Sequence, residues 1–160
     1  MNINKVKYFF NIAQDVSYAS TCLSRQVGSI LVKDGIIVST GYNGPARGVT
    51  HCYECARKSD PNYKSGMNLD ICPAVHAEAN CIASAARLGT STLDSILFIN
   101  TVVPCKSCIS ILINAGVKEV YAFDCFYDGL SMYIVNSTDI IIHLHEKDTI
   151  LKGGTITCPQ

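Results

Sequence analysis

The chain has 160 residues and a mass of 17.3 kDa, which is enough for one compact domain but too little for two independent cores. Its 13 Lys and Arg residues balance its 13 Asp and Glu residues, so the formal net charge is zero. This balance argues against a dedicated nucleic-acid binder, whose surface would be basic. The longest uncharged stretches, such as residues 107–117, are shorter than the roughly 20 apolar residues of a membrane-spanning helix, so no membrane span is expected.

The N-terminal segment differs from a secretory signal, because Asn11, Gln14 and Asp15 interrupt its apolar residues. We therefore expect a cytoplasmic protein. The chain has nine cysteines, more than core packing needs, and an odd number in a reducing compartment argues against a disulfide framework. The cysteine content instead predicts metal binding.

The predicted elements begin with a helix and a hairpin. Apolar residues recur at helical spacing over about 3–18, which predicts an amphipathic helix. Two β-rich runs at 26–33 and 36–42 flank Asp34-Gly35, a two-residue turn favoured in hairpins. Residues 43–73 have no sustained period, and so long a loop is unusual in a compact domain unless it is functional or separately anchored.

The second half of the chain alternates between helical and strand patterns. The expected helices are at about 75–88, 105–115 and 130–137, and the expected strands are at 95–100, 119–123 and 140–142. This alternation predicts an α/β fold in which at least four helices flank a sheet of five strands.

Two short motifs at expected helix starts contain metal-ligating residues. His76 and Glu78 begin one helix, and Cys105 and Cys108 follow Pro104 at the start of the next. Cysteines three apart share one face of a helix, and the positive helix terminus favours their thiolate form. One imidazole and two thiolates leave the fourth tetrahedral position of zinc open for water, as in catalytic zinc sites. This spacing is the signature of zinc-dependent nucleobase deaminases.

Glu78 is the expected catalytic residue. Zinc lowers the pKa of bound water from about 15.7 toward 7, which supplies hydroxide near neutral pH. Glu78 lies two residues beyond His76 and can carry protons from that water to the ring nitrogen and amino group of an amidine, so that ammonia leaves. The alternative is a non-catalytic interaction module with a closed zinc knuckle, in which Glu78 is a solvated helix residue.

Beyond these motifs, the chain resembles the deoxycytidylate (dCMP) deaminases, including the bacterial late-competence and phage members. The resemblance covers most of residues 1–135 and includes a Gly-Tyr-Asn-Gly segment that is specific to this branch of the zinc deaminases. It is carried by Ser24-Arg25-Gln26-Val27-Gly28, Thr40-Gly41-Tyr42-Asn43-Gly44, Val75-His76-Ala77-Glu78-Ala79-Asn80 and Pro104-Cys105-Lys106-Ser107-Cys108.

The resemblance implies a three-layer α/β/α cytidine-deaminase-like fold with a five-stranded mixed sheet. It implies a single domain over 1–160 with a zinc-anchored loop at about 44–74, assembled as a homohexamer. The implied reaction converts dCMP to dUMP and ammonia, and dUMP feeds thymidylate synthesis. A tRNA adenosine or free cytosine deaminase would share the zinc motifs, but the neutral charge counts against tRNA and neither is expected to carry Gly-Tyr-Asn-Gly.

The resemblance also implies which residues bind the substrate. An Asn offers a paired donor and acceptor to a sugar hydroxyl, and an Arg offers planar, bidentate donors to phosphate. An aromatic side chain would stack on the base, and Phe126 competes with Tyr127 for this role. The expected substrate-binding residues are Ser24, Arg25, Asn43, Ala77 and Tyr127.

Regulation is a further implication. Family members with a glycine-rich loop after the hairpin bind a triphosphate effector there, so dCTP and dTTP are the implied effectors, with Mg²⁺ accompanying the triphosphate. In this chain Pro45 follows Gly44 directly and Arg47 comes later, which departs from the family pattern at this loop.

A second, structural zinc is expected at the aperiodic loop. In the resembling phage enzymes a second zinc uses cysteines at the positions of Cys22 and Cys52, and the spacing adds Cys55 and Cys72 as ligands. Four thiolates would give a closed tetrahedral site that orders the loop. His51 is an alternative to Cys22. The remaining cysteines are expected to be non-ligands: Cys81, Cys125 and Cys158.

Overall fold

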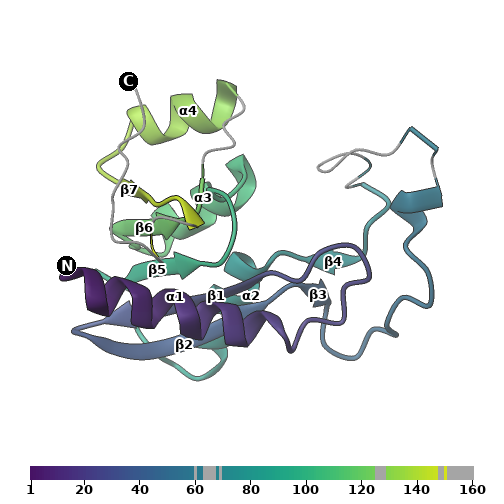
Figure 1. The fold of residues 1–160 in the computed structure, drawn as a ribbon, viewed down its shortest axis with the longest axis horizontal. Helices are drawn as coiled ribbons and strands as arrows, with labels where there is room; N and C mark the ends of the chain where they lie inside the picture. The colour runs from purple at the N-terminus through teal and green to yellow at the C-terminus, as the bar shows by residue number, and fades with distance from the viewer. Residues whose placement is uncertain (60, 63–67, 69, 125–128, 148–149, 151–160) are drawn as a thin grey trace.

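A computed structural model describes residues 1–59, 61–62, 68, 70–124, 129–147 and 150 (Figure 1). The elements in chain order are α1 (Ile3–Ser17), β1 (Gly28–Lys33), β2 (Ile36–Tyr42), β3 (Gly44–Pro45), the 3₁₀ helix η1 (Ala56–Ser59), β4 (Ala74–Val75), α2 (Ala77–Arg87), β5 (Ile96–Ile99), α3 (Lys106–Asn114), β6 (Glu119–Ala122), α4 (Gly129–Asn136) and β7 (Ile141–Leu144). Within the described residues, no helix is long and apolar enough to cross a membrane.

The main sheet has five strands in the order β2-β1-β5-β6-β7. β1 pairs antiparallel with β2 and with β5, whereas the β5–β6 and β6–β7 pairs are parallel. Asp34 and Gly35 have φ values of 52° and 78°, the two positive values that a tight hairpin turn of the favoured kind needs. The sheet is therefore mixed, and the predicted hairpin is confirmed.

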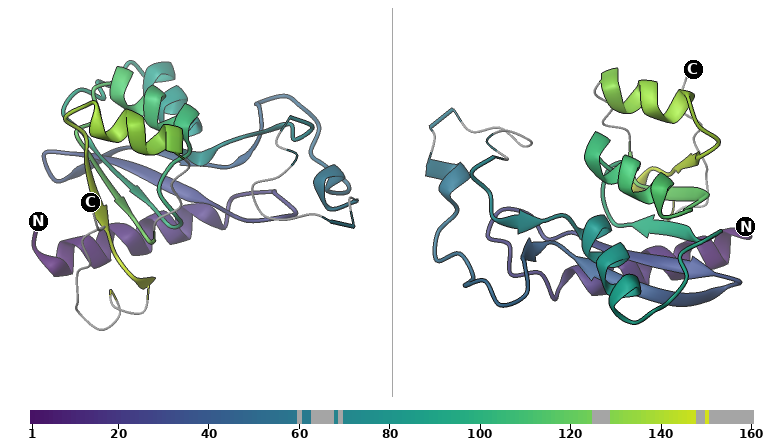
Figure 2. Two further views of the ribbon diagram at one scale, coloured as in Figure 1. Left: turned by 90° about the horizontal axis from the view of Figure 1, so that it is seen from above. Right: turned by 180° about the vertical axis from the view of Figure 1, so that it is seen from behind.

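The sheet separates two hydrophobic cores. On one face, α1 buries Phe9 and Phe10 against Phe98 of β5. On the other face, Cys81 of α2 and Leu112 of α3 are fully buried in a core that includes inward residues of β1, β5 and β6. Figure 2 shows α1 on one side of the strands, with α3 and α4 on the other. The predicted three-layer α/β/α arrangement is confirmed.

A lobe projects from this body between β3 and β4, and we use the term for the described residues of 46–73 (Figure 1). Its ends are joined because Gly44 pairs with Val75 and Pro45 with Ala74 in a two-stranded antiparallel ladder. The sequence analysis missed this ladder: β3 lies in the segment 43–73, which was predicted to have no sustained period, and β4 lies just after it, where a helix was predicted from about residue 75. It brings the end of the hairpin beside the start of α2.

Among the described residues, hydrogen bonds of Thr21 and Lys58 connect the lobe to the segment that follows α1. The Thr21 hydroxyl lies 2.9 Å from Nδ1 of His51, and Lys58 of η1 donates from Nζ to the carbonyl oxygen of Leu23 at 2.9 Å. Both bonds are at exposed positions, so water competes with them and each contributes little free energy. Exposed polar contacts thus help to hold the lobe, whereas a packed hydrophobic core stabilises the body.

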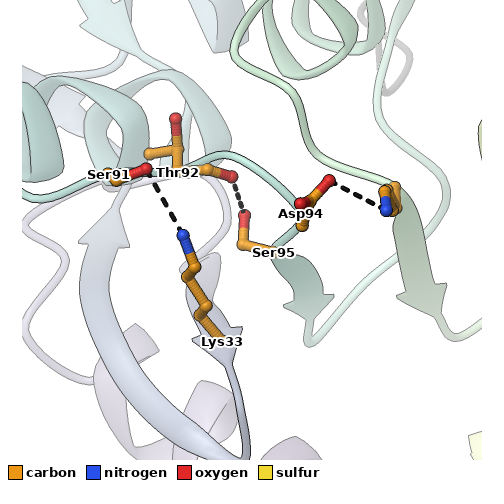
Figure 3. Close-up of polar contacts among 6 residues, drawn as sticks. Lys33, Ser91, Thr92, Asp94 and Ser95 are labelled. Carbon is orange, nitrogen blue, oxygen red and sulfur yellow. Dashed lines mark hydrogen bonds and ion pairs between the residues drawn. The ribbon is translucent and has the colours of Figure 1, made fainter.

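The connection between α2 and β5 is fixed by polar contacts at the opposite end of β5 from α3 (Figure 3). Ser95 donates to the carbonyl oxygen of Thr92 at 2.6 Å, and Lys33 of β1 donates to the Ser91 hydroxyl at 3.4 Å. Asp94 forms an ion pair of 2.8 Å with Lys118, next to β6. These contacts fix the start of β5. They thereby also fix the end of β5, after which the chain continues into α3.

Candidate metal centre and active site

The start of α2 lies directly on β2, and Gly41 makes this close approach possible. A Cβ atom at Gly41 would lie 2.7 Å from the Cα of Cys81 and would also collide with the Ala77 carbonyl oxygen. Two hydrogen bonds fix the same contact: Ser39 donates to the Cys81 carbonyl oxygen at 2.7 Å, and Asn80 donates to the Tyr42 carbonyl oxygen at 2.8 Å. The first turn of α2 is thus held rigidly on the sheet.

His76 and Cys105 occupy the same position on two neighbouring helices. His76 is the N-cap residue of α2 and Cys105 is the N-cap residue of α3, each with extended backbone angles. Cys108 lies in the first turn of α3 and is buried. Both helices therefore direct their positive N-terminal ends toward this point, which favours negatively charged ligands there.

The three predicted ligands converge. Nδ1 of His76 lies 3.6 Å from Sγ of Cys105 and 3.5 Å from Sγ of Cys108. Among the residues that the structure describes, these are the one group of three or more His, Cys, Asp or Glu residues whose ligand atoms all lie within 4.8 Å of one another. Two sulfurs and one imidazole nitrogen match the donor set of a zinc site with one open position.

Hydrogen bonds within this group shift the pKa values of Cys105 and His76 in opposite directions. Hydrogen bonding from Cys108 and from His76 lowers the pKa of Cys105 to about 4, against the effect of burial. Hydrogen bonding to Cys105 raises the pKa of His76, and the negative charge of Glu78 adds to this effect, while burial and the positive charge of Arg57 oppose it. The lowered pKa of Cys105 favours its thiolate, the form in which cysteine binds metal.

Glu78 lies in the first turn of α2 and is 5% exposed. Burial raises the pKa of its carboxyl group, while its own backbone N–H, the nearby His76 and a hydrogen bond with Cys108 lower the pKa. A buried carboxyl beside a metal-binding group can exist in charged and neutral forms, which proton transfer requires. The alternative in which Glu78 is a solvated helix residue is wrong.

The four cysteines of the expected second zinc site lie around one cavity. Its volume is about 430 Å³, and it lies between the lobe and the segment after α1. In the described part of the chain, however, their sulfurs do not form a group as compact as the first one. His51, the alternative ligand, contacts Thr21 through Nδ1. The cysteines that line the cavity are Cys22, Cys52, Cys55 and Cys72.

Asn43 organises the turn that contains the expected phosphate-binding residues. Its side-chain oxygen accepts hydrogen bonds from the Ser20 hydroxyl and the Val27 N–H, at 2.7 and 2.8 Å. Its side-chain nitrogen donates to the Arg25 carbonyl oxygen at 2.9 Å and has a second hydrogen for a ligand. Asn43 therefore has an evident role in positioning this turn, and it can offer one donor to a sugar hydroxyl.

The other expected substrate-binding residues differ in how exposed they are. Ser24 is half-buried and lines the cavity, whereas Arg25 is exposed. Ala77 as a whole residue, main chain included, is 0% exposed. Tyr127 and Phe126 lie outside the described residues.

Sequence reasoning gave no role to Gly41 or Arg57. The tight contact of Gly41 with α2 has no local signal, because it joins residues about 40 positions apart in the chain. Arg57 lies in η1, half-buried, and lines the same cavity as Ser24. The sequence signal that could have pointed to Arg57 is its position, two residues after Cys55.

The chain is similar in sequence to known metal-dependent deaminases, in agreement with the geometry of this site. Residues 3–124 match the model of the cytidine and deoxycytidylate deaminase zinc-binding region. The chain is 32% identical over 120 residues to the deoxycytidylate deaminase of Mycobacterium phage D29, covering 71% of this chain and 90% of that protein. It is 36% identical over 115 residues to the deoxycytidylate deaminase of Schizosaccharomyces pombe, covering 71% of this chain.

A solved structure resembles the whole fold. The dCMP deaminase of cyanophage S-TIM5, in complex with dCMP and dUMP, has a TM-score of 0.74 and 27% sequence identity, with 91% of this chain and 99% of that chain covered. The chain spans only 35% of the length of the S. pombe relative and 43% of that of its Saccharomyces cerevisiae counterpart. The fold and site thus define a zinc-binding domain of the deaminase type. The chain belongs to the cytidine and deoxycytidylate deaminase family.

Proposed function

We propose that this chain catalyses the hydrolytic deamination of dCMP to dUMP and ammonia. The single observation that carries this proposal is the buried carboxyl of Glu78 in the same helix turn as His76 and beside Cys105 and Cys108. A closed structural zinc site has no use for such a carboxyl. The relatives named deoxycytidylate deaminase support dCMP as the substrate.

The proposed catalytic ligands are His76, Cys105 and Cys108, which would hold zinc. When bound, zinc lowers the pKa of a coordinated water and so supplies a nucleophile near neutral pH. Glu78 accepts a proton from the attacking water and delivers it to the ring nitrogen beside the carbon under attack. It then carries the proton of the added hydroxyl to the departing amino group, which leaves as ammonia while that oxygen becomes the carbonyl of dUMP. Burial supports this role because it raises the carboxyl pKa, which brings the neutral form within reach.

Substrate recognition is proposed to involve the residues around the Asn43 turn. The free hydrogen of the Asn43 amide meets a sugar hydroxyl, and Ser24 and Arg25 contribute to binding the phosphate. Ala77, at the start of α2, lies next to the base, and Tyr127 stacks on it.

A second zinc is proposed at the four cysteines that line the cavity, with a structural role only. Its support is that segments far apart in the sequence bring these cysteines to one cavity. Four thiolates would close the coordination sphere and offset the entropy cost of ordering the lobe.

The proposal includes the properties of the whole protein. Residues 1–160 form one deaminase domain that assembles as a homohexamer in the cytoplasm. dCTP and dTTP, with Mg²⁺, act as effectors. Sedimentation of the zinc-loaded protein tests the hexamer, and rates measured with each triphosphate test the regulation.

The test of function is ammonia release by the zinc-loaded protein. We expect dCMP to be the preferred substrate over CMP, deoxycytidine, cytosine and a tRNA with adenosine in its anticodon. The matched control is Glu78→Gln, which keeps the size of the side chain but cannot transfer protons. Turnover of cytosine or tRNA in preference to dCMP would overturn the proposal, as would equal turnover by the Glu78→Gln protein.

A further inference from the structure

Asn100 is a buried polar residue at the end of β5 that the proposed reaction does not use. It is 8% exposed and directly follows Ile99, the last residue of the strand. Phe98 belongs to the core under α1, and Asn100 lies on the same side of the sheet because its side chain contacts Gln14 of α1. A polar side chain at such a position needs hydrogen-bond partners for its amide atoms.

Asn100 pairs both backbone groups of Gly28, the first residue of β1. Its side-chain oxygen accepts from the Gly28 N–H at 2.9 Å, and its own backbone N–H donates to the Gly28 carbonyl oxygen at 3.1 Å. Its side-chain nitrogen donates to Oε1 of Gln14 at 3.2 Å. Asn100 therefore links β5, β1 and α1 at one point, which requires an acceptor and a donor on the same side chain.

The start of β1 is in direct backbone contact with α1. A Cβ atom on Gly28 would lie 2.9 Å from the Cα of Ser17 and would collide with the Ala13 carbonyl oxygen. The helix is itself fixed here, because Gln14 donates from Nε2 to the Ser17 Oγ at 3.1 Å and the Ser17 hydroxyl donates to the Gln14 carbonyl oxygen at 2.6 Å. Gly28 is thus held by α1 as well as by Asn100.

Asn43 pairs the preceding residue in the same way. Its side-chain oxygen accepts from the Val27 N–H at 2.8 Å, and its backbone N–H donates to the Val27 carbonyl oxygen at 3.1 Å. The Val27 carbonyl and the Gly28 N–H belong to one peptide unit, which we call the linking peptide. Because a peptide unit is planar, the hydrogen bond from Asn100 at one end of the linking peptide also sets the direction of the carbonyl that faces Asn43.

We propose that Asn100 is a positioning residue for substrate binding, which acts through the linking peptide on the Asn43 side chain that meets the sugar. This inference rests on the proposed deamination of dCMP. Any rotation of the linking peptide moves the Val27 N–H that holds the Asn43 oxygen, and so turns the amide away from the sugar hydroxyl. Glu78 and the metal ligands lie on α2 and α3 and keep their places.

The kinetic test uses Asn100→Leu, which keeps the size of the side chain but pairs neither Gly28 nor Gln14. We expect KM for dCMP to rise about 2- to 13-fold, the effect of losing one hydrogen bond, with kcat changed less than about 2-fold and zinc content unchanged. Asn100→Asp keeps an oxygen for the Gly28 N–H and should raise KM less. Phe98→Leu is the matched control, because it destabilises the same core and should leave KM unchanged.

A double-mutant cycle separates positioning from a loss of stability. Asn43→Ala removes the group through which Asn100 acts, so adding Asn100→Leu to it should raise KM for dCMP no further. Additive effects of the two substitutions would overturn the inference, as would an equal rise of KM in Phe98→Leu. If Asn100→Leu does not fold, the same cycle with Asn100→Ser decides.

Amide hydrogen exchange supplies a readout that needs no substrate. In Asn100→Leu, exchange at the Val27 N–H should become faster relative to the other amides of the sheet, because the linking peptide is no longer held. Phe98→Leu should not produce this local difference. Unchanged relative exchange at Val27 in Asn100→Leu would overturn the inference. A wild type that does not deaminate dCMP would instead refute the proposed function itself.

Discussion

The two groups of cysteines in this chain differ in how completely the polypeptide positions them. The catalytic group lies at the N-terminal ends of two helices, one of which is packed against β2 without room for a side chain at Gly41. Its ligand atoms lie within 4.8 Å of one another in the structure of the polypeptide alone. The cysteines around the lobe share a cavity, but the described residues do not gather their sulfurs as closely.

The difference follows from what supports each group. The helices that carry the catalytic ligands bury Cys81 and Leu112 in a packed core, so the ligand positions are set when the core forms. The lobe is joined to the body by a ladder of two residue pairs and by exposed hydrogen bonds at Thr21 and Lys58. Packed helix ends can preorganise the ligands of a catalytic metal, whereas a weakly supported loop becomes ordered when it binds a metal.

The largest effect is expected at Glu78. Glu78→Gln should reduce kcat for dCMP by more than the about 10²- to 10⁴-fold typical of general acid–base catalysis, because one carboxyl serves several proton transfers. Zinc content should not change, because Glu78 lies beside the three ligands and is not one of them. Steady-state kinetics and metal analysis of the same sample test this, and near wild-type turnover with zinc retained would contradict it.

The next effect separates the two cysteine groups. We expect two zinc ions per chain in the wild type and one in Cys52→Ser, Cys55→Ser, with a lower melting temperature, because a structural zinc contributes folding free energy directly. Cys81→Ala, a buried cysteine outside both groups, is the control and should retain both ions. A wild type that holds a single zinc under metal-replete conditions would show that the second site does not exist.

The third prediction tests the support of the catalytic group. Gly41→Ala should destabilise the protein by about 1–3 kcal/mol and reduce turnover, because the added methyl meets the backbone of α2 and must push it away from β2. Gly44→Ala is the control for stability, because its methyl would meet only the Thr21 hydroxyl oxygen at an ordinary 3.6 Å. Denaturant unfolding of both proteins tests the contrast, and equal stabilities would refute the role given to Gly41.

The smallest effect is expected at the base of the lobe. Thr21→Val removes the hydroxyl that contacts His51 and should cost only about 0.5 kcal/mol, since the hydrogen bond is exposed. Limited proteolysis should then cut the lobe faster while the unfolding midpoint hardly changes. A large loss of global stability would mean that the lobe and the body unfold together.

Local patterns predicted most of the body. The Asp34-Gly35 turn, the periodic helices and the alternating second half each carry their signal within a few residues. The spacing of His76, Cys105 and Cys108 predicted the metal site, because one imidazole and two thiolates at helix starts form the donor set of a catalytic zinc. The helix predicted from about 75 begins at Ala77, which leaves His76 as its N-cap residue.

Long-range contacts could not be predicted in this way. The β3–β4 ladder joins residues about 30 positions apart through two pairs, too few to give either strand a recognisable pattern. Arg57 has no distinguishing neighbours in the sequence, and its place on the cavity wall depends on how η1 docks on the segment after α1. Such features arise from tertiary packing, which no window of the sequence contains.

The central claim is that the polypeptide preforms the catalytic site while the lobe depends on its own metal. Stepwise addition of zinc to the metal-free protein, with dCMP turnover and amide hydrogen exchange followed together, tests it most directly. We predict that one equivalent restores turnover without changing exchange in α2, and that a separate equivalent slows exchange in the lobe. A single equivalent that restores turnover and protects α2 and the lobe together would contradict the account.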